Sequence, residues 1–224
     1  MPKISVILTS RNHRAHIGEA IQSVLNQTFS DFELIIWDDA STDNSWDVIK
    51  SYPDARIKAF RNEIQRYGVY GVNKAIAEIA TGEYIAIHHS DDIWEPEKLE
   101  KQVRFLEGHP EFGAVFSWVS VINNDGKILE NHLLLNFFAQ ANRTRHEWLR
   151  HFLFFGNALC HPSVLIRRQC YQDCGLYRLG MWQLPDFDMW TRLCLKYEIH
   201  VLPEPLVRFR WHGDGSNSSA PNTL

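Results

Sequence analysis

The sequence contains few cysteines, no long apolar run and no excess of basic residues. Its four cysteines are too sparse among 224 residues for a disulfide framework, which favours a reducing cytosol. No apolar run approaches the roughly 18–20 residues that cross a bilayer, and residues 1–8 lack the parts of a secretion signal. Lys and Arg number 23 against 27 Asp and Glu, a balance that disfavours nucleic-acid binding. We therefore expect a cytoplasmic protein without a transmembrane segment.

Glycine-rich phosphate-binding motifs are also absent. No Gly-x-Gly-x-x-Gly follows the first apolar run and no P-loop occurs, which disfavours dinucleotide oxidoreductases and P-loop enzymes. In contrast, 45% of the residues are hydrophobic, enough to bury the core of one domain. The eight tryptophans suit core packing and also the apolar faces of sugars, so composition leaves the ligand open.

The first ninety residues alternate short apolar runs with segments of helical spacing. Strands are predicted at 4–8, 32–37, 57–60 and 84–87, and helices at 15–26, from 45 onward and at 72–80. Beyond them we predict a helix at 96–106, a strand at 114–121, a tight turn at 123–126, a strand at 163–166 and a helix at 186–196. Residues 132–160 are aromatic-rich without a clear period. This order predicts an α/β fold with a mostly parallel central sheet flanked by helices, which binds ligands at the carboxyl ends of its strands.

Two polar clusters follow predicted strands. Residues 38–43 follow the second strand, and residues 88–92, His-His-Ser-Asp-Asp, follow the fourth. Imidazoles and carboxylates suit a divalent cation that bridges protein and diphosphate. The alternative is a solvated loop in which Asp92 caps the helix that begins at Pro96, and the spacing alone leaves both interpretations open.

The order of several segments resembles family 2 glycosyltransferases of the GT-A fold, from Ile4 to Ser218. The resemblance is carried by residues 5–12, 23–29, 32–43, 82–85 and 90–96. It implies a Rossmann-like GT-A domain over 1–212, with a donor-binding half at 1–122, a smaller mixed acceptor-side half at 123–212 and a flexible tail or lid at 213–224. It also implies transfer from a nucleotide diphosphate sugar with inversion, assisted by Mn²⁺ or Mg²⁺.

The same resemblance implies roles for residues of the donor-binding half. Thr9, Asp38, Asp39 and Ser90 would line the nucleotide pocket, and a carboxylate such as Asp39 could accept a hydrogen bond from the base. Arg66 would substitute for the arginine with which the family often binds the diphosphate.

The family's Asp-x-Asp signature falls on His89-Ser90-Asp91. Asp91 is therefore the first candidate metal ligand, and Asp92, His89 and His212 are the others. His89 stands where the family has a carboxylate, which favours Mn²⁺ or weakens metal dependence because imidazole suits softer ions. The preceding His88 is expected to face the core or a neighbouring helix.

By resemblance, Asp186 is the catalytic base that takes the proton of the acceptor hydroxyl during in-line attack. Pro185 replaces the glutamate that commonly precedes this aspartate, and the alternative is that Asp186 only caps its helix. Asn157 and His161 would contact the acceptor. Asp188, Trp190 and Leu193 are interpreted as structural.

These expectations define an enzyme that adds a sugar to a carbohydrate or lipid-linked carbohydrate acceptor, such as a growing surface polysaccharide. Peripheral association with the inner face of the plasma membrane is compatible with such an acceptor. A catalytically impaired nucleotide-sugar-binding module is one alternative, because His89 and Pro185 stand where the family has acids. A metal-dependent phosphohydrolase is another, built on a cluster of His88, His89, Asp91, Asp92 and His212. The enzymatic interpretation requires Asp39, Asp91 and Asp186 to converge.

Overall fold

The structure, a computed structural model, describes residues 1–66, 69–181 and 184–213. Its strands are β1 (Ile4–Ser10), β2 (Phe32–Asp38), β3 (Ile57–Arg61), β4 (Tyr84–His89), β5 (Ile93–Trp94), β6 (Phe112–Ile122), β7 (Leu165–Arg167) and β8 (Glu198–Arg210). Its α-helices are α1 (Ile17–Leu25), α2 (Ser45–Lys50), α3 (Tyr70–Lys74), α4 (Lys98–Gly108), α5 (Leu133–Phe138), α6 (Arg145–Phe155), α7 (Arg168–Cys174) and α8 (Pro185–Cys194). A π-helical turn, η1 (Ala75–Ile79), extends α3, and a 3-10 turn, η2 (His161–Ser163), precedes β7.

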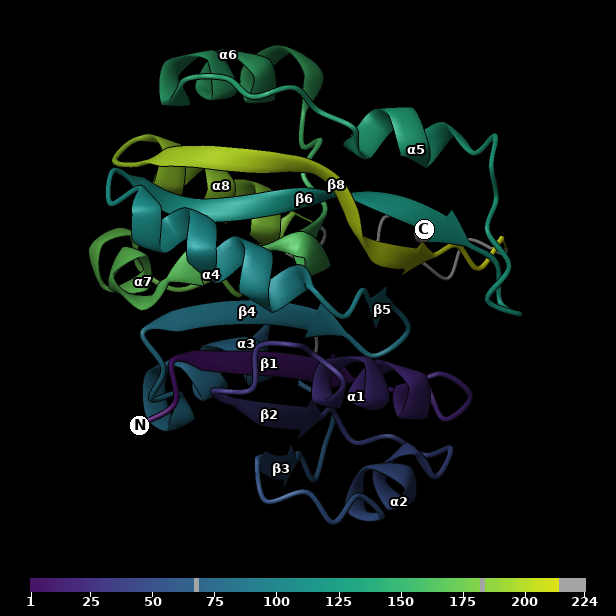
Figure 1. Cartoon of the computed structure of the whole chain (residues 1–224). Helices are drawn as coiled ribbons and strands as arrows, with labels where there is room; N and C mark the ends of the chain where they lie inside the picture. Colours follow the sequence, from purple (N-terminus) through teal and green to yellow (C-terminus); the bar gives the residue numbers. More distant parts are fainter. Residues whose placement is uncertain (67–68, 182–183, 214–224) are drawn as a thin grey trace.

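All eight strands form one sheet in the order β3-β2-β1-β4-β7-β6-β8-β5 (Figure 1). The first four of these strands are mutually parallel, as the alternation of strands and helices predicts. β7 is antiparallel to β4 and β6, whereas β8 is parallel to β6 and antiparallel to β5. The α/β class and the mixed second half are therefore confirmed.

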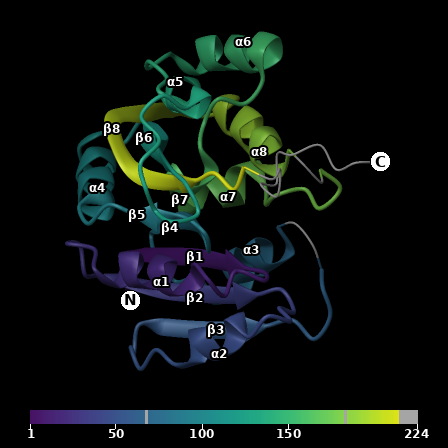
Figure 2. The same ribbon diagram turned by 90° about the vertical axis from the view of Figure 1, so that its right-hand side faces the viewer.

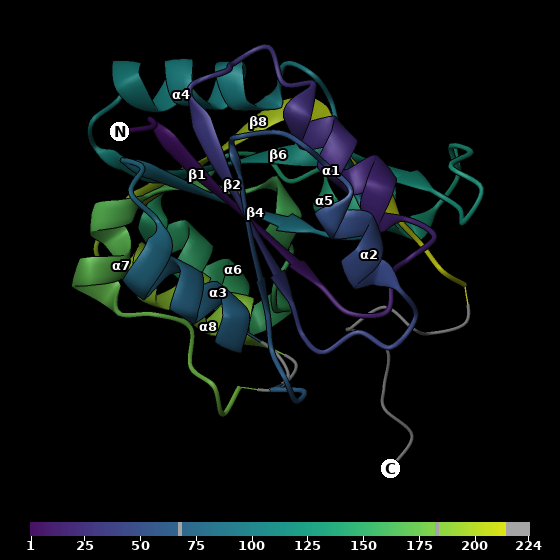
Figure 3. The same ribbon diagram turned by 90° about the horizontal axis from the view of Figure 1, so that it is seen from below.

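Helices cover both faces of the sheet, which gives the molecule three layers (Figures 1 and 3). Along β1, Val6 and Leu8 face the cluster that packs on α1, α2 and α4, whereas Ile7 faces the cluster formed with α3, α7 and α8. Because both faces are buried, such strands read in the sequence as unbroken apolar runs.

Buried polar contacts fix the spacing of the first strands. Glu33 of β2 accepts hydrogen bonds from the Ser5 hydroxyl (2.7 Å), the Thr81 amide (2.8 Å) and the Lys58 ammonium group (2.6 Å). Burial disfavours the ionised carboxylate, but these hydrogen bonds outweigh it and lower the pKa of Glu33 to about 2. Gly82 lets the turn before β4 approach β1, because a Cβ there would lie 2.5 Å from the Ser5 nitrogen.

Several element boundaries differ from the sequence-based prediction, and two of these shifts have a local cause. The helix expected from Pro96 begins at Lys98, because the Pro96 carbonyl accepts a hydrogen bond from the Thr28 amide. The strand expected from Ser163 begins at Leu165, because Ser163 closes the 3-10 turn onto the Cys160 carbonyl. The segment without a clear period contains α5 and α6, which lie at the outer edge of the molecule (Figure 2).

No helix within the described ranges is both long and apolar enough to cross a membrane. Of the tail or lid predicted at 213–224, only Gly213 lies inside the described residues.

Candidate functional site

The carboxyl ends of β1, β2 and β4 lie side by side and carry the predicted donor-side residues. Thr9 of β1 is in register with His89 of β4, and Ser10 is in register with Asp38 of β2. The Asp39 amide donates to the Ser10 carbonyl at 2.9 Å. The structure therefore brings Thr9, Asp38, Asp39 and His89 to one edge of the sheet, where open α/β sheets bind ligands.

The two aspartates that follow β2 differ in burial. Asp38 is fully buried, and its Oδ2 accepts a hydrogen bond from the Ser41 amide at 3.0 Å, which closes the turn after β2. Asp39 is half-buried, and its Oδ1 accepts hydrogen bonds from the Asn62 side chain (2.7 Å) and the Arg66 amide (2.8 Å). Arg66 thus contacts Asp39 with its backbone amide.

Three candidate metal ligands converge directly after β4. One ligand atom each from His89, Asp91 and Asp92 lies within 4.8 Å of the others. The Asp91 Oδ2 lies 2.9 Å from the Nε2 of His212, the fourth candidate. Asp92 Oδ1 accepts a hydrogen bond from the Arg210 amide at 2.8 Å, whereas its buried Oδ2 has no hydrogen-bond partner among the described residues.

These contacts remove the helix-cap interpretation of Asp92. The residue before α4 is Glu97, and the Leu99 amide in the first turn of that helix donates to the Gln27 side chain rather than to Asp92. The unpartnered Asp92 oxygen beside a second carboxylate and an imidazole is an arrangement that a divalent cation would complete. The residues present therefore fit the predicted metal.

The pKa values of the two carboxyl groups are shifted in opposite directions. Burial raises the pKa of Asp91, but the His212 hydrogen bond and the nearby imidazoles of His13 and His89 outweigh it and hold the pKa below its ordinary value. Burial and the charge of Asp91 together raise the pKa of Asp92 well above its ordinary value. A bound cation would favour the ionised form of both.

Two further histidines surround His212 and were missed by the sequence analysis. The rings of His13 and His16 lie 6.1 and 5.7 Å from the His212 ring, centroid to centroid. The Nδ1 of His13 lies 2.7 Å from the Ser90 hydroxyl, which ties the loop after β1 to the loop of the candidate metal ligands. Their spacing of three residues in the segment directly before α1 is the only signal that the sequence offered.

Arg210 at the end of β8 holds this loop in place, and sequence reasoning gave it no role. Its fully buried guanidinium donates to the Asp91 carbonyl (2.7 Å), to the Asn123 and Asn124 carbonyls (2.9 Å each) and to the Glu19 carboxylate (2.8 Å). β8 therefore fixes the backbone that presents Asp91.

On the acceptor side, the structure pairs two predicted residues. The Asn157 side chain donates to Asp186 Oδ2 at 2.8 Å, and the Phe187 amide donates to Oδ1 at 2.8 Å. Burial raises the pKa of Asp186 above its ordinary value and outweighs these hydrogen bonds. Asp186 thus contacts the first turn of α8 and also reaches the chain beyond α6, which is more than a helix cap.

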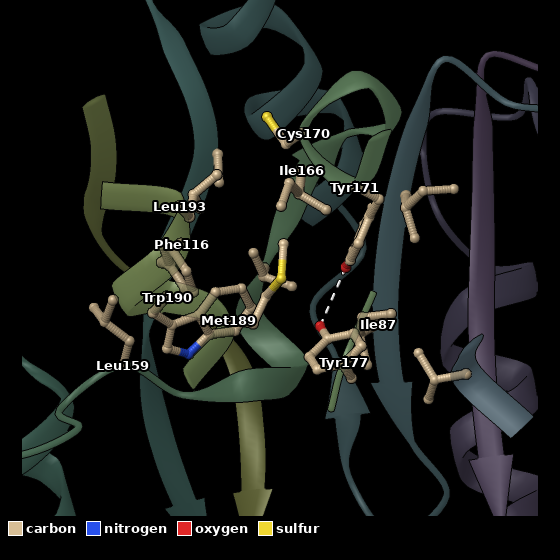
Figure 4. Close-up of a cluster of buried hydrophobic side chains, with 14 of the residues drawn as sticks. Ile87, Phe116, Leu159, Ile166, Cys170, Tyr171, Tyr177, Met189, Trp190 and Leu193 are labelled. Atoms are coloured by element: carbon tan, nitrogen blue, oxygen red, sulfur yellow. Dashed lines mark hydrogen bonds between the residues drawn. The ribbon is translucent and has the colours of Figure 1, made fainter. Parts of the chain in front are cut away.

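His161 links the two sides of the site. Its Nδ1 lies 3.2 Å from the Nε2 of His89, and its Nε2 lies 3.0 Å from the Tyr177 hydroxyl. Tyr177 in turn lies 3.1 Å from the Tyr171 hydroxyl, deep in the core (Figure 4). The charge of Asp186 contributes to raising the pKa of Tyr177, behind the larger effects of burial and Tyr171. The acceptor-side pair is therefore within electrostatic reach of this chain of hydrogen bonds.

The residues expected to be structural lie as predicted. Asp188 forms ion pairs with Arg178 (2.9 Å) and Arg192 (2.7 Å). Trp190 and Leu193 are buried, and Trp190 lies beside Phe116 and Met189 (Figure 4). His88 is likewise buried, with its ring 4.3 Å from the Trp94 ring.

A protein-family model described as "Glycosyl transferase family 2" matches residues 5–168. The chain is a family 2 glycosyltransferase. An uncharacterised glycosyltransferase of Methanocaldococcus jannaschii is 29% identical over 93% of this chain and 71% of its own length. The Escherichia coli UDP-Glc:alpha-D-GlcNAc-diphosphoundecaprenol beta-1,3-glucosyltransferase WfaP is 37% identical over 50% of this chain and 44% of its own length.

Solved structures of similar fold confirm the predicted GT-A architecture. S. aureus TarS in complex with UDP-GlcNAc has a TM-score of 0.74 and 20% identity, over 99% of this chain and 62% of TarS. The Pyrobaculum calidifontis mannosyltransferase PcManGT in complex with GDP-Man and Mn²⁺ has a TM-score of 0.69 and 18% identity, over 97% of this chain and 59% of its own. The glycosyltransferase thus spans about three fifths of the length of these two chains.

Proposed function

We propose that this glycosyltransferase moves a sugar from a nucleotide diphosphate sugar to a saccharide or lipid-linked saccharide acceptor, with inversion, in surface polysaccharide biosynthesis at the cytoplasmic side of the membrane. The observation that carries the proposal is the group of Asp91, Asp92 and His89 directly after β4, at the carboxyl edge of the parallel strands. Nucleotide sugars are bound by the solved relatives TarS and PcManGT, which supports a donor of this class. The name of WfaP gives a lipid-linked acceptor, which supports that alternative for the acceptor.

In this proposal the donor lies across the ends of β1, β2 and β4. Thr9, Asp38 and Asp39 line the nucleotide pocket, with the half-buried Asp39 placed to accept a hydrogen bond from the base. Ser90 and Arg66 complete the donor side. Arg66 would reach the diphosphate with its guanidinium, while its backbone amide keeps its hydrogen bond to Asp39.

Asp91, Asp92, His89 and His212 would hold Mn²⁺ or Mg²⁺. The cation would neutralise charge that develops on the departing diphosphate. The imidazole of His89 in the family's carboxylate position favours Mn²⁺, because imidazole is a better ligand for softer ions. His89 suits this role, because burial lowers its pKa and so favours the neutral form that binds metals.

Asp186 is the proposed base. As the acceptor hydroxyl oxygen attacks the anomeric carbon, its proton passes to a carboxylate oxygen of Asp186. The bond from that carbon to the diphosphate oxygen breaks on the opposite face, which inverts the configuration. Asn157 holds Asp186 in orientation through the 2.8 Å hydrogen bond, and His161 contributes to the acceptor side.

The test is incubation with UDP-, GDP- and dTDP-sugars, Mn²⁺ or Mg²⁺, and either simple saccharides or polyprenyl-diphosphate-linked saccharides. We expect one donor to release its nucleoside diphosphate in an acceptor-dependent reaction, with an anomeric configuration in the product opposite to that of the donor by NMR. Failure of every donor to react would contradict the proposal.

Two additional measurements separate the alternatives. A catalytically impaired binding module, suggested by His89 and Pro185, would bind a nucleotide in calorimetry without turnover. A metal-dependent phosphohydrolase would release phosphate from simple esters without an acceptor.

A further inference from the structure

The last turn of α6 exposes three consecutive large apolar side chains. Leu153, Phe154 and Phe155 are 78%, 66% and 75% exposed, and we refer to them as the apolar tip. The rest of the helix is anchored by the buried Trp148 and Phe152, which belong to the core cluster that also contains the buried side chains of α8. Contiguous exposed apolar groups of this size mark interaction surfaces rather than ordinary solvent-facing residues.

The helix behind the apolar tip is basic, although the chain as a whole carries a net charge of −4. Residues 143–155 contain three arginines and one acid, Glu147; Arg145 is paired with Glu198 of β8 (3.9 Å) and Arg143 lies over the Trp148 ring (4.7 Å). The Glu147 carboxylate accepts hydrogen bonds from the Thr144 amide and hydroxyl in a capping box, whereas Arg150 is exposed. Exposed aromatic and aliphatic groups next to arginines are the composition of a segment that lies in a membrane interface.

The apolar tip adjoins the proposed base. Phe155 is two residues before Asn157, and Leu184, which is 49% exposed, is two residues before Asp186. Because Asn157 and Asp186 are hydrogen bonded, apolar side chains flank this pair along both segments of chain.

We propose that the apolar tip docks on an anionic phospholipid bilayer, with Arg150 beside the lipid phosphates. A second copy of the chain is a poorer occupant, because a two-fold contact through this patch would bring like-charged arginines together. Docking in this way would bring Asn157 and Asp186 to the surface that holds a lipid-linked acceptor. That last consequence rests on the proposed function, whereas bilayer binding does not.

The test is co-sedimentation of the whole chain with vesicles of equal parts phosphatidylcholine and phosphatidylglycerol, and with vesicles of phosphatidylcholine alone. We expect binding to the anionic vesicles that weakens at high salt. The double substitution Phe154→Ser with Phe155→Ser is expected to lower the partition coefficient at least about tenfold, because the inserted apolar area is lost. Ile128→Ser, at a side chain 60% exposed just beyond the turn after β6, is the matched control and is expected to bind like the wild type.

Circular dichroism and the thermal midpoint verify that the substituted chains remain folded. The proposal is overturned if the wild type does not co-sediment with anionic vesicles or if the double substitution binds as tightly as the wild type. It is equally overturned if Ile128→Ser weakens binding as much as the double substitution does. It is also overturned if light scattering shows a dimer that only the double substitution dissociates. The readout involves no sugar transfer, so failure of the proposed function leaves this result intact, and the reverse holds.

Discussion

Asp186→Asn is expected to remove sugar transfer while leaving the fold intact. The Asp186 carboxylate accepts one hydrogen bond from Asn157 and one from the Phe187 amide. Asparagine has a single oxygen, so one of these donors would face an amide donor, at a cost of about 1 kcal/mol. In return, the substitution removes a buried charge whose pKa is raised by desolvation. Because these effects oppose each other, we expect the free energy of unfolding at neutral pH to change by about 1 kcal/mol or less.

The expected effect on turnover is much larger. Loss of a general base costs about 10²–10⁴ in rate, or about 3–5 kcal/mol of transition-state stabilisation. The assay is the initial rate of nucleoside diphosphate release at saturating donor, with donor binding followed by calorimetry and expected to stay unchanged. Asp188→Asn is the matched control on the same helix, and is expected to lower stability through its two ion pairs but to preserve the rate per folded molecule. A rate for Asp186→Asn within about threefold of the wild type would refute the assignment.

The pH profile provides a second criterion. A protonated carboxyl group cannot accept the proton of the acceptor, so the wild-type rate is expected to fall on acidification through the pKa of Asp186. Since burial raises that pKa, the fall begins at a higher pH than an exposed aspartate would give. The residual rate of Asp186→Asn is expected to lack this acidic limb, and an unchanged limb would assign the titration to another group.

Three further substitutions test the metal site and the fold. His89→Asp is expected to strengthen Mg²⁺ binding relative to Mn²⁺ in calorimetry with nucleoside diphosphate present, because carboxylate oxygen suits the harder ion; an equal change for both ions would contradict this. Gly82→Ala is expected to cost at least about 2–3 kcal/mol in urea unfolding, because its Cβ would meet backbone at 2.5 Å. Gly108→Ala, with nothing within 4 Å of its Cβ, is the control and is expected to stay within about 1 kcal/mol of the wild type. Glu33→Gln is expected to destabilise the protein at neutral pH, and the deficit is expected to shrink as pH falls from about 4.5 to about 2, since the native carboxylate with its lowered pKa loses its contribution on protonation. A deficit independent of pH would argue against that origin.

The donor-side half of the fold was predictable from the sequence because its strands are buried on both faces. The apolar runs at 4–8, 32–37 and 84–87 correspond to β1, β2 and β4. Their order with the intervening helices is sufficient to predict parallel pairing. Residues that directly follow such strands, including Asp39 and Asp91, could be located for the same reason.

The strand β8 and the helix α6 were not predictable from periodicity. β8 contains Pro203 and Pro205 and pairs with β6 through shifts of register, so it does not follow a regular alternation. α6 exposes its apolar tip, which breaks the helical pattern of apolar residues. The sequence did contain one usable signal, the capping box formed by Thr144 and Glu147.

The residues that join the site through contacts with distant parts of the chain could not be predicted from the sequence either. His13 joins the site only because β8 places His212 beside it, and Arg210 acts on the backbone of a loop more than a hundred residues earlier. Neither residue carries a local pattern that distinguishes it from an ordinary surface histidine or arginine. The acceptor-side contact of Asn157 with Asp186 was likewise visible only after folding, although each residue had been named alone.

The insertion of β8 between β6 and β5 has a consequence for biosynthesis. β5 directly follows the loop that carries Asp91, and Arg210 on β8 supplies hydrogen bonds to that loop. The strands of the donor half leave the ribosome early, yet the loop lacks its final support until residues 198–212 have emerged as well. A nascent chain arrested before Glu198 is therefore expected to form the parallel strands while the loop of the candidate metal ligands still lacks Arg210, so that this loop gains its support later than the donor-half strands form.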